Sequence, residues 1–155
     1  MLGVTTYSFL DVHLVLEGPG GAVSLGASSA TAKEGITIEP VEEVDTMQGG
    51  ADGSIIHSLH AAKTAKAIIR LLKTSPVNQQ LSGMLALQRS TSLLHGQNTL
   101  VLSNPVTGDV YTGQSVAFAR VPSNTWAEDA GMIEWTFNIG ILNQNIGGGI
   151  NTIGA

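Results

Sequence analysis

Charged side chains are scarce in this sequence. Asp, Glu, Lys and Arg make up 12% of its 155 residues, and 43% of the residues are hydrophobic. About 25% charge is usual for soluble domains, and a monomer of this size normally covers its exposed surface with it. No apolar stretch approaches the roughly 20 residues that a membrane helix needs, so membrane insertion is not expected. We therefore expect much of the surface to contact other copies of the chain.

Cysteine is absent, which excludes a disulfide framework, a thiolate metal site and a redox motif. Basic residues are few: 7 Lys and Arg stand against 12 acids, giving a net charge of −5. This balance argues against a protein that grips nucleic acid, whose usual footprint is a basic patch. It does not argue against a protein along which nucleic acid slides without being held. Residues 1–18 lack a basic start, and Asp11 and His13 interrupt their apolar run, so no secretory signal is expected.

The length predicts one domain, residues 1–144, with a glycine-rich tail at 145–155. Strand patterns dominate it, at 7–16, 35–41, 98–103, 110–121 and 131–141, and a turn is expected at 18–21. The clearest strand is 131–141. There we expect one face to be apolar and the other polar: Ile133, Trp135, Phe137, Ile139 and Ile141 against Glu134, Thr136 and Asn138. The expected fold is mainly β, an antiparallel β-sandwich or barrel with one helix.

That helix is predicted over about residues 76–94. Ser75 is a suitable cap, and Pro76 fits the first helical position. Gly96 is a candidate for the left-handed residue that ends the helix. The expected buried stripe has helical spacing and is apolar up to its last member: Val77, Leu81, Met84, Leu85 and Gln88.

Residues 42–53 have a different composition, with four acids, three glycines and no base. We expect a loop that is mobile in the free subunit and becomes ordered against a neighbouring subunit. Strand patterns return at 54–60 and 64–73, which could form one long strand with a bulge near 61–63. The candidate inter-subunit contacts in the loop are Glu42, Glu43, Asp45, Met47 and Asp52.

No catalytic, cofactor-binding or metal site is predicted. His57 and His60 form an H-x-x-H pattern, but on a strand this odd offset sends the two rings to opposite faces. The glycines at 18–21 match no phosphate-binding motif, and no serine lies in a nucleophile motif. Trp126, in a polar loop, is a candidate interface residue.

The chain resembles the tail tube proteins of contractile-tailed bacteriophages. The resemblance rests on an ordered set of short stretches at 7–12, 18–21, 34–38, 50–54, 57–60, 70–76, 96–98 and 131–135. It implies a subunit that forms hexameric rings, which stack helically inside a sheath, and whose sheets join into one barrel around a channel. It also implies contacts with sheath, baseplate and tail terminator proteins, DNA as passing cargo, and a place in the virion tail after synthesis in the host cytoplasm.

The channel lining is expected to be acidic or neutral, because Lys and Arg would hold the phosphates of passing DNA. Thr37 and Glu39 are the favoured lining residues, since Ile36 and Ile38 face inward on the same strand. The face of Glu134, Thr136 and Asn138 is the alternative, and it could instead meet the sheath. A tail terminator, baseplate adaptor or secretion-tube protein of the same fold remains an alternative function, and an enzyme is disfavoured.

Overall fold

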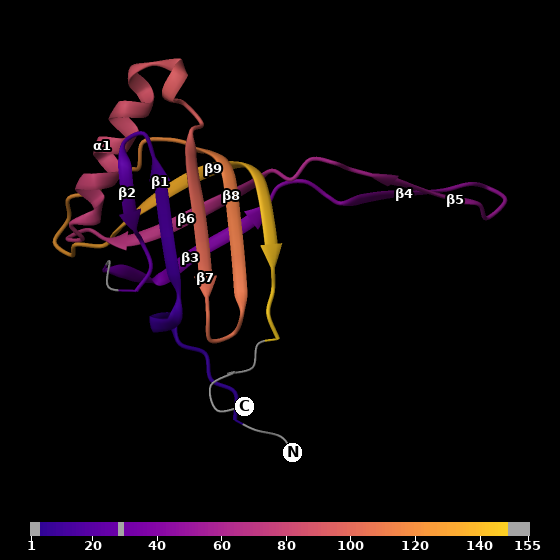
Figure 1. Cartoon of the computed structure of the whole chain (residues 1–155), viewed down its shortest axis with the longest axis horizontal. Helices are drawn as coiled ribbons and strands as arrows, with labels where there is room; N and C mark the ends of the chain where they lie inside the picture. The colour runs from indigo at the N-terminus through magenta and orange to yellow at the C-terminus, as the bar shows by residue number, and fades with distance from the viewer. Residues whose placement is uncertain (1–3, 28–29, 149–155) are drawn as a thin grey trace.

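The chain folds into one curled antiparallel sheet with a helix beside it and a long projecting hairpin (Figure 1). The computed structural model describes residues 4–27 and 30–148. The strand order of the sheet is β2-β1-β7-β8-β9-β6-β3. Its strands are β1 (His13–Gly18), β2 (Gly21–Ser24), β3 (Thr31–Pro40), β6 (Ala65–Leu72), β7 (Asn98–Asn104), β8 (Asp109–Phe118) and β9 (Met132–Asn145). The prediction of a mainly β, antiparallel fold with one helix is confirmed.

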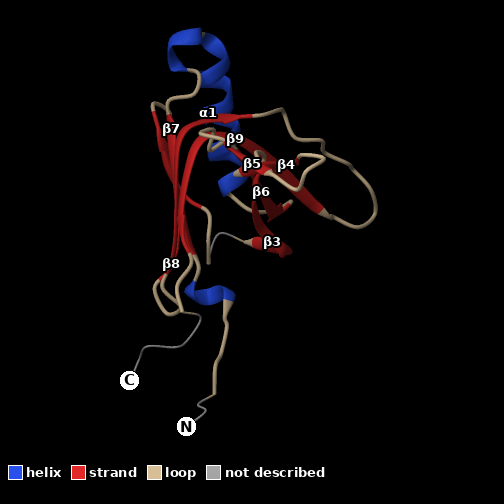
Figure 2. Cartoon of the chain, turned by 90° about the vertical axis from the view of Figure 1, so that its right-hand side faces the viewer, coloured by secondary structure: helices blue, strands red, loops and turns tan. Residues whose placement is uncertain are grey.

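Strand β9 makes the sheet curl. Residues 132–139 pair with β6, and residues 137–145 pair with β8, so β9 joins the two halves of a half-barrel. Figure 2 shows β7 and β8 on one side of this curl and β3 and β6 on the other. The core lies between them and includes the packed rings of Phe118, Trp135 and Phe137.

The alternation predicted for β9 holds up to Ile139 and then shifts. Ile141, expected in the core, is exposed, and Leu142 is buried in its place. The reason is a β-bulge in β8 at Ser115, whose φ is +55°, directly beside Gly140. A Cβ at Gly140 would lie 2.9 Å from the Ser115 Cβ, so the close approach of the two strands here requires a glycine.

Helix α1 (Val77–Ser90) is shorter than predicted at its C-terminal end, and the 3-10 helix η2 (Ser92–Leu94) follows it. Thr91 is extended and its hydroxyl accepts a hydrogen bond from the Leu93 N–H, which ends the α-helix within the polar run. At the other end, the Ser75 hydroxyl accepts from the Val77 N–H. Gly96 has a positive φ, but it follows η2 and not α1. Among the described residues, no helix is long and apolar enough to cross a membrane.

The chain after β9 stays close to the sheet. The Gly147 N–H donates to Asp109 Oδ1 over 2.8 Å, and Gly147 packs against the backbone of Thr107 and Gly108. The first residues of the expected tail therefore contact the sheet, since β9 ends at Asn145 and Gly147 bonds Asp109. Most of the predicted tail, residues 149–155, lies outside the described residues.

Candidate functional site

Three surfaces of the subunit are candidates for assembly, and the first is the outer side of β3, β6 and β9. We call it the polar face. Its side chains stand in register across the three strands: Thr37, Ile68 and Thr136 form one row, and Glu39, Lys66 and Asn138 form the next. Arg70 and Glu134 form a third pair beside them. Thr37 and Glu39 therefore share one face with Glu134, so the two alternatives for these residues, channel lining and sheath contact, do not lie on separate faces.

The polar face carries both signs of charge. Arg70 Nε lies 3.4 Å from Glu134 Oε2, and its Nη1 donates to Thr37 Oγ1 over 3.1 Å. Arg120, from the segment after β8, reaches the other oxygen of Glu134 over 3.5 Å. Glu39 stands opposite Lys66 in the strand register. The face is thus close to neutral, and it is not the acidic surface that Glu39 alone would suggest.

The second surface is the outer side of β2, β1, β7, β8 and the last part of β9, which we call the uncharged face. Its central row runs through Ser24, Val15, Val101, Thr112 and Asn143. Val110 and Ile141 are also exposed on it, and among its strand residues only His13 and Glu17 can carry charge. Lys63, from the segment before β6, reaches Asn143 at its margin. A broad exposed surface with so little charge suits burial against another protein.

The third surface is the projecting hairpin, formed by β4 (Asp45–Gly49) and β5 (Ile55–Leu59) (Figure 1). Within the segment 42–53, where a mobile loop is expected, residues 45–49 are a strand, and the mobility in the free subunit stays a prediction. The idea that 54–60 continues into 64–73 is wrong, since β5 and β6 belong to different sheets. Every residue of both strands is exposed, including Leu59 at 84%. The large apolar side chains exposed here are Val44, Met47, Ile55, Ile56 and Leu59.

Polar contacts hold the hairpin in register. His57 Nδ1 lies 2.9 Å from Asp45 Oδ2, while His60 bonds Thr46 and so lies on the opposite face, as its odd offset predicts. In the turn, hydrogen bonds from the Ser54 hydroxyl and N–H lower the pKa of Asp52. No group of three metal-ligating side chains occurs within the described residues.

The remaining acidic candidates and Trp126 are also at the surface. Glu42 and Glu43 are exposed in the segment between β3 and β4. Trp126 is 80% exposed, and the Lys73 ammonium lies 5.0 Å from its ring centroid. Lys73 also donates to the Thr125 carbonyl, which fixes the ammonium beside the indole. This arrangement leaves one side of a large ring available to a partner.

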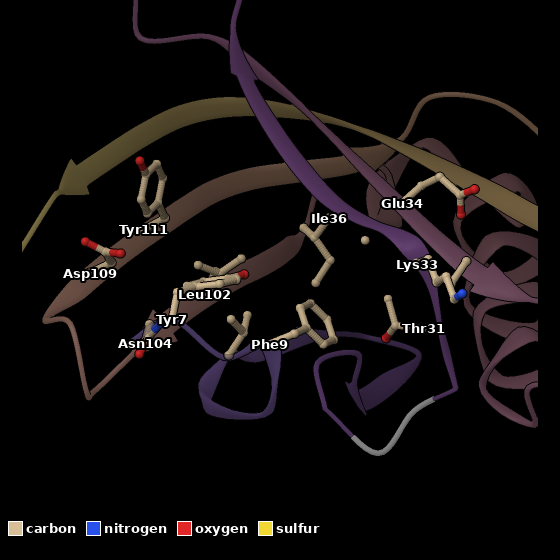
Figure 3. Close-up of a pocket in the computed structure, with 13 residues that line it drawn as sticks. Tyr7, Phe9, Thr31, Lys33, Glu34, Ile36, Leu102, Asn104, Asp109 and Tyr111 are labelled. Carbon is tan, nitrogen blue, oxygen red and sulfur yellow. The ribbon is translucent and has the colours of Figure 1, made fainter. Parts of the chain in front are cut away.

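A cavity of about 470 Å³ on the open side of the half-barrel was not predicted from the sequence (Figure 3). Tyr7 and Phe9, from the segment before β1, line it together with Ile36 of β3 and Leu102 and Tyr111 of β7 and β8. No short-range pattern could have revealed it, because its walls come from segments about 100 residues apart in sequence.

Solved structures of contractile systems share this architecture. The sheath/tube terminator of an extracellular contractile injection system, PVC, in its extended state, is 10% identical, with a TM-score of 0.51 over 94% of this chain and 98% of that chain. The tube-terminating cap of the anti-feeding prophage is 8% identical, with a TM-score of 0.52 over 94% of each chain. At these identities the likeness shows the fold alone. No curated protein sequence matches the chain.

Among the described residues, the curled antiparallel half-barrel with one α-helix is thus the fold that these solved structures share. The chain belongs to the bacteriophage PhiTE tail tube protein family, whose family model matches residues 4–147. The resemblance found in the sequence is confirmed, and the protein is a component of a virion tail.

Proposed function

We propose that the chain is the repeating tube subunit, that six copies form a ring, and that stacked rings enclose the channel through which DNA leaves the virion. The observation that carries the proposal is the hairpin of β4 and β5. A two-stranded hairpin is marginally stable in water on its own, and this one exposes apolar side chains on both faces. A second copy of the chain would cover these side chains, so we assign the hairpin to contacts between stacked rings.

Ring closure would use the two ends of the curled sheet. β2 and β3 are its terminal strands, and α1 packs beside β2. The outer edge of β3 has no strand next to it within the described residues, and an open edge is a template for pairing. Joining each β3 edge to the next subunit would cover the open edge, so that it could not pair with other chains, and would produce a continuous barrel. The number of six subunits rests on the family resemblance.

The polar face is the proposed channel lining, with Thr37 and Glu39 among the lining residues. Its near neutrality supports this choice, because an excess of Lys and Arg would hold the phosphates by releasing their counterions. Glu39→Lys would place a second base beside Lys66. We expect tubes with this substitution to assemble and to eject DNA more slowly. Ejection at the normal rate, from tubes confirmed to carry the lysine, would exclude Glu39 from the lining.

Negative-stain electron microscopy of the purified protein tests the proposed function. We expect rings or tubes with a central channel, and tubes inside the sheath of intact tails. A protein that stays monomeric at high concentration across salt conditions, and that is absent from the tube of tails, would overturn the proposal.

The second candidate is a tube terminator. Both structures with a TM-score above 0.5 described above are terminating proteins, which favours this alternative. A terminator would form one ring and stop, whereas a tube subunit would polymerise, so the length of the particles separates the two. In either role the chain would contact sheath and baseplate proteins, would need no cofactor, and would have no catalytic activity.

A further inference from the structure

We propose that Glu134 prevents the polar face from binding nucleic acid, by occupying two arginines that would otherwise bind phosphate. This inference rests on the proposed function, in which DNA passes that face. Each oxygen of the Glu134 carboxylate is taken by a different guanidinium: Oε2 by Arg70 and Oε1 by Arg120. One acid thus pairs with two bases that come from different parts of the chain.

The two arginines differ in their surroundings. Arg70 is held within the sheet, with its side chain 19% exposed, between the Glu134 carboxylate and the Thr37 hydroxyl. Arg120 is 65% exposed and has Glu134 as its carboxylate partner. A guanidinium binds a phosphate through the same fork of N–H groups with which it binds a carboxylate. Glu134 and a DNA phosphate would therefore compete for the same donors.

The local charge balance depends on this one residue. The strand register and the ion pairs place five ionisable groups together on the polar face: Glu39, Lys66, Arg70, Arg120 and Glu134. Without Glu134, three bases of this group would stand against one acid. Acids farther away than about 8–10 Å would compensate little, because charges at that distance are screened at physiological salt. The face would then have the basic character that phosphate binding requires.

The test compares Glu134→Gln with Glu17→Gln, which removes the same charge from the uncharged face. Binding of a short labelled DNA duplex is followed by fluorescence anisotropy over a salt series, at concentrations where sedimentation shows unassembled subunits. We expect Glu134→Gln to bind at least about tenfold more tightly than Glu17→Gln, with a salt slope steeper by up to about 1.8, since each phosphate contact contributes about 0.9. Adding Arg120→Gln to Glu134→Gln should remove about half of this increase in slope.

A second variant covers the case in which Glu134→Gln fails to fold because Arg70 loses its carboxylate partner. Glu134→Gln with Arg70→Gln removes the half-buried cation and leaves Arg120 free, so binding should still rise, with about 0.9 added to the slope. Folded variants whose affinity and salt slope equal those of Glu17→Gln would overturn the role of Glu134. Failure of the wild-type chain to form rings or tubes would instead overturn the proposed function, and the binding result on free subunits would not depend on it.

Discussion

At the scale of single residues, Gln88 shows how one side chain joins the helix to the sheet. Its Oε1 accepts from the Phe118 N–H over 2.9 Å, and its Nε2 donates to the Phe118 carbonyl over 3.3 Å. The amide thus occupies the position that a neighbouring strand would take at the end of β8. The sequence places Gln88 on the buried stripe of the helix, but a partner 30 residues away could not be predicted from helical spacing.

Replacing Gln88 by Leu should destabilise the fold by about 2–3 kcal/mol, because a buried N–H and a buried carbonyl would both lose their partner. Urea denaturation measures the change in the free energy of unfolding. Gln80→Leu, at an exposed position of the same helix, is the matched control and should change stability by less than about 0.5 kcal/mol. Equal effects of the two substitutions would show that the Gln88 amide has no stabilising role.

For Thr136 we predict the opposite effect, a gain of stability when its polar group is removed. Its hydroxyl is buried on the polar face and has no hydrogen-bond partner among the described residues. Thr136→Val keeps the shape and removes a desolvated polar group, so we expect the protein to gain about 1 kcal/mol of stability. Thr112→Val on the uncharged face is the control, with an expected change near zero. A clear loss of stability for Thr136→Val, by thermal unfolding, would contradict the assignment.

At the scale of elements, the sequence predicts which residues of a single strand or helix are buried. It does not predict features that depend on contacts between elements. The inward face of β9 and the apolar stripe of α1 follow from alternation and helical spacing, and both are largely confirmed. β4 was missed because residues 45–49 lie within a run of acids and glycines that shows no strand pattern. The shared face of Glu39 and Glu134 was missed because strand order cannot be read from the pattern of one strand.

The hairpin should be the least protected element of the free subunit. Its backbone hydrogen bonds are surrounded by solvent, whereas those of the seven-stranded sheet lie over the core. We expect fast hydrogen exchange for amides 45–59 in the free subunit and strong protection after assembly. Exchange that stays fast in assembled tubes would contradict a role of the hairpin in stacking.

Deletion of residues 46–52 tests the same element by a different route. The deletion removes most of β4 and the turn, and it leaves the large sheet and its core intact. We therefore expect the unfolding of the body to change little, while stacking of rings weakens. Circular dichroism and sedimentation measure the two effects separately. Loss of the body fold would contradict the prediction, as would stacking at the wild-type level.

At the scale of the whole molecule, the scarcity of charged residues can be assigned to two surfaces, the uncharged face and the hairpin. The uncharged face covers one half of the curled sheet. The hairpin projects from the body (Figure 1), and its apolar side chains are exposed. The acids expected to make inter-subunit contacts are interspersed with these apolar side chains: Glu42 and Glu43 precede Val44, and Asp45 shares a hairpin face with Met47. Two kinds of contact, ionic and apolar, are therefore possible at the same interface.

The salt dependence of assembly distinguishes ionic from apolar contacts. The Debye length falls from about 10 Å at 0.1 M to about 3 Å at 1 M, so assembly through exposed acids would weaken as salt rises. Apolar contacts respond in the opposite direction, because salts such as sulfate favour burial of surface. Since the exposed strands of the hairpin and the uncharged face offer more apolar than ionic contacts, we expect assemblies to persist in molar NaCl and to grow in sulfate. Sedimentation should also show weaker assembly for Met47→Ser than for Glu42→Gln with Glu43→Gln. Assemblies that dissociate in molar NaCl, or that depend on Glu42 and Glu43 more than on Met47, would assign the interface to the acids.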